Sequence, residues 1–144
     1  MKKKLTGTNK HGPPISRTVV SPGDDPKHEL VLLEINRTTT TSSDPDFNET
    51  EQFDYTQLDE VAGTGTHRGY FRRLHKNGDI DYGSYEGTQK TSVKEDGSWE
   101  RTWEGTWKTH GGTGKFKNLK GSGTYRGKAT AQEASTEFEG EVEY

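Results

Sequence analysis

The chain has 144 residues, a hydrophobic fraction of only 24% and a formal net charge of −3, and it contains no cysteine. This length suits a single domain, and the lack of cysteine excludes a disulfide framework, a thiol nucleophile and a thiolate metal site. So few apolar residues are typical of disordered chains, but the small net charge and the regular spacing of the aromatic residues favour a folded domain with a polar outer face and a thin core.

The N-terminal segment contains four of the five prolines and shows no sustained periodicity. We expect a partly ordered arm over residues 1–26 and a single domain over residues 27–144. Three lysines follow the initial methionine, but no apolar run comes after them, so we expect no signal peptide in this sequence. No segment approaches the about 20 apolar residues of a membrane helix, which argues against a membrane partner.

Alternating patterns in the rest of the chain predict strands. Residues 30–35 form the one strongly apolar run, which we interpret as a strand buried on both faces. The acidic segment 47–58 is weakly patterned and is either an edge strand or a long loop. From residue 67 the alternation is sharper, with turns at Asn77-Gly78 and Glu95-Asp96-Gly97. The strands predicted there span residues 67–75, 80–91, 99–109, 124–131 and 136–144.

The last of these strands indicates which face lies inside. Its four glutamates alternate with Phe138 and Val142, and because glutamates need water, we expect the two apolar side chains to point inward. The three tryptophans of 99–109 share one face, which we also expect inside because exposed indoles are costly. Alternation then gives nine inward candidates for a binding site: His67, Phe71, Arg73, Tyr85, Trp99, Arg101, Trp103, Trp107 and Tyr125.

Arg101 is the most informative of these candidates because it lies between two tryptophans on an inward face. A buried guanidinium needs an acceptor, and indoles on either side let it stack while its fork meets an anion. We therefore predict that the nine residues bind a small hydrophobic molecule that is aromatic or acidic, with Arg101 as its anchor. The alternatives are that Arg101 extends into water at a mouth and that His67 has only a structural role.

Other functions are less well supported. Glu86 and Glu104 are expected to point outward, which argues against a carboxylate pair for glycoside cleavage. The five histidines show no metal-ligand spacing, so we expect no metal and no cofactor. The glycine-rich stretch 111–115 lacks the spacing of a phosphate-binding loop. The net charge is negative and the aromatic residues of the basic segment 108–128 are expected inside, so we expect no nucleic-acid partner.

The stretch Gly111-Gly112-Thr113-Gly114-Lys115-Phe116, followed by Lys120-Gly121 and flanked by predicted strands, resembles a segment of the dirigent and allene oxide cyclase superfamily. The resemblance covers about residues 63–144 and is greatest to small bacterial members of unknown function. It implies an all-β fold, a closed antiparallel eight-stranded barrel of calycin-like shape with a central cavity, often in dimers or trimers.

The same resemblance implies two classes of function. The first is a module that binds a small molecule in its cavity. The second is a cofactor-free cyclase or isomerase of a reactive hydrophobic intermediate, because plant members direct the closure or coupling of such intermediates and bacterial relatives include polyketide cyclases. No catalytic residue of the family can be aligned with a residue of this chain.

Overall fold

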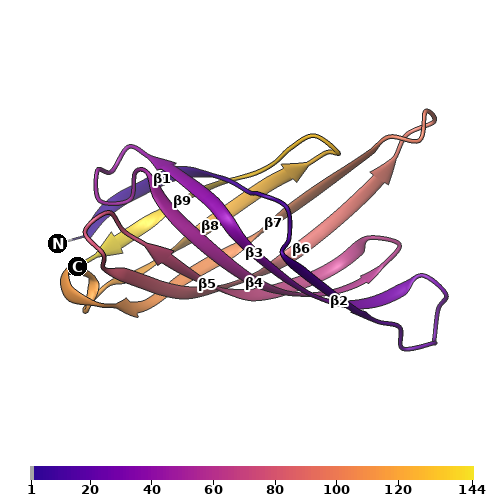
Figure 1. Cartoon of the computed structure of the whole chain (residues 1–144), viewed down its shortest axis with the longest axis horizontal. Helices are drawn as coiled ribbons and strands as arrows, with labels where there is room; N and C mark the ends of the chain where they lie inside the picture. The colour runs from indigo at the N-terminus through magenta and orange to yellow at the C-terminus, as the bar shows by residue number, and fades with distance from the viewer. Residues whose placement is uncertain (1) are drawn as a thin grey trace.

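The computed structural model describes residues 2–144, which form one elongated and twisted antiparallel sheet (Figure 1). The only helical segment in this described range is a single 3-10 turn, η1 (Gly114–Phe116). The nine strands are β1 (Lys2–Lys10), β2 (Ser16–Val20), β3 (His28–Ser42), β4 (Thr50–Val61), β5 (Thr64–Leu74), β6 (Ile80–Val93), β7 (Trp99–Gly112), β8 (Lys120–Ala129) and β9 (Ala134–Glu143).

The strands are arranged in a ring. Their order is β1-β9-β8-β7-β6-β5-β4-β3-β2, and β1 also pairs with β3, so eight strands lie in a continuous circuit of neighbours. Strand β3 is long enough to have two neighbours on one side: residues 30–34 pair with β2, and residues 39–42 pair with β1. The all-β antiparallel class predicted from the sequence is confirmed.

The N-terminal segment differs from the sequence-based expectation. Residues 2–10 are not an arm but strand β1, which lies in the ring between β9 and β3. Leu5 and Asn9 face inward and are only 1% and 6% exposed, while Lys4 and Lys10 face water. The segment lacks an apolar pattern of its own, so only its pairing with two strands distant in sequence makes it a strand.

Strands β3 and β4 also correct the expectations. Leu30 and Leu32 are 42% and 53% exposed, whereas Val31 between them is 4% exposed, so this run is buried on one face and not on both. Residues 50–58 of the acidic segment belong to β4, which lies between β3 and β5 and is therefore not an edge strand, while residues 47–49 lie in the loop before it. In β3, an irregularity between Ile35 and Thr38 shifts the register, as a β-bulge does.

The five strands from β5 onward follow the predicted pattern. The turns at Asn77-Gly78 and Glu95-Asp96-Gly97 connect β5 to β6 and β6 to β7. Phe138 and Val142 are buried and the four glutamates of β9 are exposed, as are Glu86 and Glu104. The inward and outward faces that alternation predicted for these strands are therefore confirmed.

Aromatic rings and glycines face each other across neighbouring strands of the ring. Trp103 pairs with Gly127, and Tyr125 pairs with Gly105. A β-carbon added at either glycine would collide with the ring opposite it. Each ring therefore lies along the neighbouring strand instead of extending toward the centre. This arrangement accounts for many glycines in the strands, and it leaves space inside the ring.

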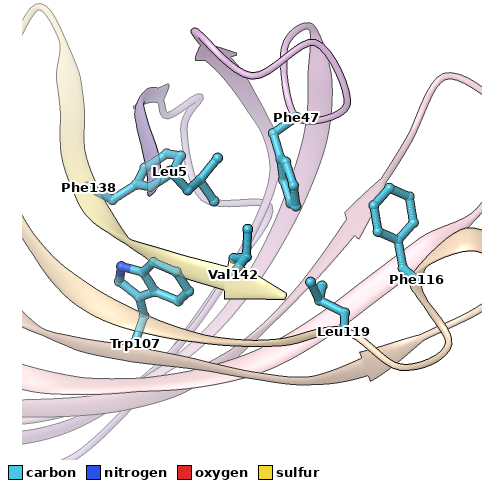
Figure 2. Close-up of a cluster of buried hydrophobic side chains, with 7 residues drawn as sticks. All are labelled: Leu5, Phe47, Trp107, Phe116, Leu119, Phe138 and Val142. Atoms are coloured by element: carbon cyan, nitrogen blue, oxygen red, sulfur yellow. The ribbon is translucent and has the colours of Figure 1, made fainter. Parts of the chain in front are cut away.

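A cluster of apolar side chains fills one end of the ring, and we call it the plug (Figure 2). Figure 1 shows both termini at this end, while the β6–β7 hairpin protrudes at the other. Phe47 and Phe116 are 0% and 1% exposed and come from loops, the second from the GGTGKF segment. The members of the plug are Leu5, Phe47, Trp107, Phe116, Leu119, Phe138 and Val142.

Candidate functional site

A cavity of about 560 Å³ occupies the interior of the ring. Its floor includes the plug residues Leu5, Trp107 and Phe138. At the opposite end it is lined by residues 12–14, by residues 130–133 and by Trp99, which is 39% exposed, and we call this end the mouth. The structure places all nine predicted site residues on the cavity wall: His67, Phe71, Arg73, Tyr85, Trp99, Arg101, Trp103, Trp107 and Tyr125.

Arg101, the predicted anchor, already has a carboxylate partner. Its Nη2 lies 2.7 Å from Oε1 of Glu60, and its Nη1 donates to Oγ1 of Thr91 at 3.2 Å. The Arg101 side chain is 22% exposed and that of Glu60 is 8% exposed. The guanidinium thus neither extends freely into water nor presents a free fork to the cavity. The sequence analysis did not identify Glu60.

His67 forms a hydrogen-bonded chain with two other lining residues. Gln89 donates through Nε2 to the Thr66 carbonyl at 3.0 Å, so its Oε1 accepts from Nδ1 of His67 at 2.9 Å. Nε2 of His67 is then the acceptor for the Tyr125 hydroxyl at 2.6 Å. Burial lowers the pKa of His67, aided by the charge of Arg101, and burial raises the pKa of Tyr125. Both groups are therefore uncharged at neutral pH.

Tyr85 completes an aromatic group with these two side chains. Its ring centroid lies 6.2 Å from that of His67 and 6.0 Å from that of Tyr125. Its hydroxyl contacts Oγ1 of Thr56 on β4. Burial raises the pKa of Tyr85, and the nearby charge of Asp54 raises it further. The phenol is therefore a neutral hydrogen-bonding group on the cavity wall.

Asp54 is a buried carboxyl group of the cavity wall that the sequence analysis missed. It is 5% exposed and lines the cavity from β4. Gln52 donates to its Oδ1 at 2.8 Å, and Thr38 donates to its Oδ2 at 3.2 Å. Burial raises the pKa of Asp54, opposed by the charges of His11 and Arg73 and by these two hydrogen bonds.

A second chain of hydrogen bonds leads to Asp54 from the tryptophan wall. Nε1 of Trp103 donates to Oγ1 of Thr136 at 2.9 Å, which leaves the Thr136 hydroxyl to donate to Nε2 of His11 at 2.7 Å. Nδ1 of His11 then donates to Oγ1 of Thr38 at 3.0 Å. Burial lowers the pKa of His11, against the opposing charge of Asp54. All donors of this chain thus point toward the carboxyl group.

Arg73 lies deeper, next to the plug. It is 5% exposed, and its Nη2 donates to Oε1 of Gln52 at 2.8 Å. Its Nη1 is 3.9 Å from the fully buried Asp81. The guanidinium carbon lies 5.3 to 5.7 Å from the ring centroids of Phe47, Phe71 and Phe138. The positive charge of Arg73 is therefore offset by a neighbouring carboxylate and stabilised by aromatic faces.

The turn between β4 and β5 is a feature of the sequence that could have placed Asp54 on the inward face. A two-residue turn at Ala62-Gly63 connects β4 to β5, and it fixes Leu58 opposite His67 and Asp54 opposite Phe71. Residues that pair directly share a face of a sheet. An inward His67 and Phe71 would therefore have placed Asp54 inside, had this turn been recognised as a hairpin.

The comparisons with protein families and with curated proteins find no match. Within residues 2–144, no helix is long and apolar enough to cross a membrane. In the same part of the chain, no group of three or more suitable side chains is arranged to hold a metal ion. The function must therefore be argued from the cavity.

Proposed function

We propose that the chain binds a small, largely aromatic and uncharged molecule in the cavity. The observation that carries this proposal is a cavity of about 560 Å³ that opens at one end and has walls of tryptophan and tyrosine rings. Pockets for small molecules typically have this size, with apolar walls and few polar groups. The hydroxyl, imidazole and carboxyl groups of the wall would fix the orientation of the ligand.

The charges on the cavity wall favour an uncharged ligand over the acidic one that the sequence also suggested. Arg101 is paired with Glu60 at 2.7 Å, and Nη1 of Arg73 lies 3.9 Å from Asp81, so each cation already has a carboxylate nearby, although the buried Nε of Arg73 has no hydrogen-bond partner among the described residues. Burying a carboxylate without a free cationic partner is costly. An acid that binds at Arg101 would have to displace Glu60.

For the fold, we propose a closed barrel of the dirigent and allene oxide cyclase type. The circuit of eight neighbouring strands supports this proposal. So does the GGTGKF segment, whose Phe116 packs into the plug at one end of the ring. A homodimer or homotrimer stays a prediction, which light scattering of the purified protein would test.

Tryptophan fluorescence provides a direct test of binding, because all three tryptophans line the cavity. A set of uncharged aromatic ketones and amides would be titrated against the protein alongside aromatic acids of matched size. We expect saturable quenching by uncharged compounds, at least tenfold weaker binding to Tyr85→Ala, and unchanged binding to Tyr70→Ala, which alters an outward residue that is 67% exposed. Failure of every compound to quench, or equal binding to both variants, would contradict the proposal.

A cyclase or isomerase is the second candidate function. It is favoured by one observation: the cavity wall carries a buried carboxyl group, Asp54, beside neutral phenol and imidazole groups. Such groups can exchange protons with a bound molecule. No such group is needed for a cavity that only holds an apolar ligand.

A further inference from the structure

We infer that Asp54 and Tyr85 act together on a bound ketone, Asp54 as the base that removes a proton from the carbon next to the carbonyl and Tyr85 as the hydrogen-bond donor to the carbonyl oxygen. The inference rests on the proposed function, since it requires that the cavity binds an uncharged molecule. It adds a reaction class, enolisation and the isomerisations that follow from it, and it assigns a role to each residue.

The geometry around Asp54 suits a base. Each carboxyl oxygen accepts one hydrogen bond, from Gln52 and from Thr38, and this fixes the orientation of the group. Two carboxylate oxygens can accept about four hydrogen bonds, so acceptor capacity remains for a substrate. Burial makes the carboxylate a stronger base than an exposed aspartate, because its pKa is raised.

Tyr85 lies at a suitable distance for the second role. Its hydroxyl contacts Thr56, two residues after Asp54 on the same inward face of β4. Residues at this spacing are about 7 Å apart along a strand. That distance accommodates a carbonyl oxygen near the phenol and the neighbouring carbon near the carboxylate. When the Thr56 hydroxyl donates to the phenol oxygen, the phenol proton is free to donate to the substrate.

The other buried bases in this part of the ring are already engaged, and Glu133, the second carboxylate that lines the cavity, is exposed at its mouth. His67 uses both ring nitrogens, one toward Gln89 and one toward Tyr125. Glu60 is paired with Arg101 at 2.7 Å. Within residues 2–144, Asp54 is therefore the buried carboxylate of the cavity lining, with unused acceptor positions and no direct guanidinium partner.

The step transfers one proton and no net electrons. Asp54 takes the proton from the carbon, the electrons of that bond form a carbon–carbon double bond, and the carbonyl electrons move onto the oxygen, where Tyr85 stabilises the charge. In D₂O the carboxyl group exchanges this proton for a deuteron from water that enters through the mouth, and its return to the same carbon completes exchange. Return of a proton to a conjugated carbon gives an isomer instead. No oxidant, metal or cofactor takes part.

Deuterium exchange tests this step with 2-tetralone as the probe, an uncharged aromatic ketone with acidic hydrogens beside its carbonyl. The rate of exchange in D₂O would be followed by proton NMR for the wild type, Asp54→Asn, Tyr85→Phe and the control Glu104→Gln, which alters an exposed outer carboxylate. Fluorescence titration with the same probe measures binding separately, and circular dichroism confirms folding. We expect Asp54→Asn to slow exchange by about 10² to 10⁴-fold and Tyr85→Phe by about tenfold, with the control unchanged.

The outcomes separate the two proposals. A wild-type protein that binds 2-tetralone but exchanges its protons no faster than Asp54→Asn would overturn the inference and leave the proposed function standing. Saturable binding together with loss of exchange in both cavity variants, at unchanged affinity, would support both. If the wild type shows neither binding nor exchange with 2-tetralone, the binding proposal fails for this ligand class and the inference fails with it.

Discussion

The two ends of the ring differ in polarity, since apolar side chains fill the plug and polar contacts predominate at the mouth. At the plug, Phe47 and Phe116 are almost fully buried, and their rings meet edge to face with centroids 5.8 Å apart. At the mouth, the contacts are polar, with Arg101 held by Glu60 and Trp99 39% exposed. A chain with 24% hydrophobic residues cannot fill its whole interior with apolar side chains. Concentrating them at one end leaves the rest of the interior as a cavity with a hydrogen-bonded wall.

The main source of stability and the proposed binding site therefore lie in different parts of the ring. Burial of apolar area is the largest stabilising contribution to a fold, and most of the fully buried large side chains belong to the plug. The middle of the cavity holds carboxyl, imidazole and phenol groups whose burial is costly unless each is hydrogen bonded. Substitutions at the two ends should therefore differ in their effects.

The largest loss of stability is expected from a substitution in the plug. Phe116→Ala removes a side chain that is 1% exposed and should lower the free energy of unfolding by about 3 to 5 kcal/mol, through lost burial and the void left behind. Trp99→Ala at the mouth should cost under about 1 kcal/mol, because that ring is partly in water already. Urea unfolding of the two variants measures both values, and equal losses would contradict the division between plug and mouth.

A smaller loss of stability is expected when the charged residue Arg101 near the mouth is replaced. Arg101→Met removes the partner of Glu60, whose side chain is 8% exposed, and should cost about 1 to 2 kcal/mol, since part of the pair is accessible to water. The double variant Arg101→Met with Glu60→Gln should regain most of this loss. Urea unfolding of both variants tests the pair, and no recovery in the double variant would show that Glu60 does not depend on Arg101.

Stability should also depend on pH through the cavity histidines. Burial lowers the pKa of His11 and His67 from the usual 6.5, so the unfolded chain takes up protons before the folded one does. Their contribution is present above pH 6.5 and is lost as the pH falls toward the folded values. Urea unfolding near pH 7.5 and near pH 5 should show a loss of about 1 kcal/mol, and the loss should be smaller in His67→Gln. A loss of the same size in that variant would place its origin elsewhere.

The smallest expected change is a gain in stability, which comes from replacing Asp54. Burial raises the pKa of Asp54, so its contribution to stability is present below the unfolded value of 3.8 and is lost as the pH rises through the folded value. Asp54→Asn does not ionise and should raise the free energy of unfolding at pH 7 by up to about 1 kcal/mol. Thermal unfolding at pH 7 and pH 4 measures the gain, which should be smaller at pH 4. A clear destabilisation at pH 7 would mean that the ionised form is favoured by the fold.

Much of the aromatic wall was predictable because its strands are local. The tryptophans of β7 and the phenylalanine and valine of β9 alternate with charged residues, and short hairpins connect β5 to β6 and β6 to β7. Alternation beside a short turn fixes both the register and the inward face. For this reason all nine predicted residues lie on one cavity wall, although their binding of a ligand stays a prediction.

The role of the polar strands became clear from how the strands pair in three dimensions. The inward face of β4 carries Gln52, Asp54 and Glu60 while Phe53 and Tyr55 lie on its outer face, so hydrophobicity alone indicates the wrong side. Strand β1 likewise has no apolar alternation and is defined by β9 and β3, which are far from it in sequence. Alternation along the chain predicts which side chains share a face of a strand. The register with neighbouring strands determines which face lies inward, because a buried polar side chain is stabilised by partners on other strands.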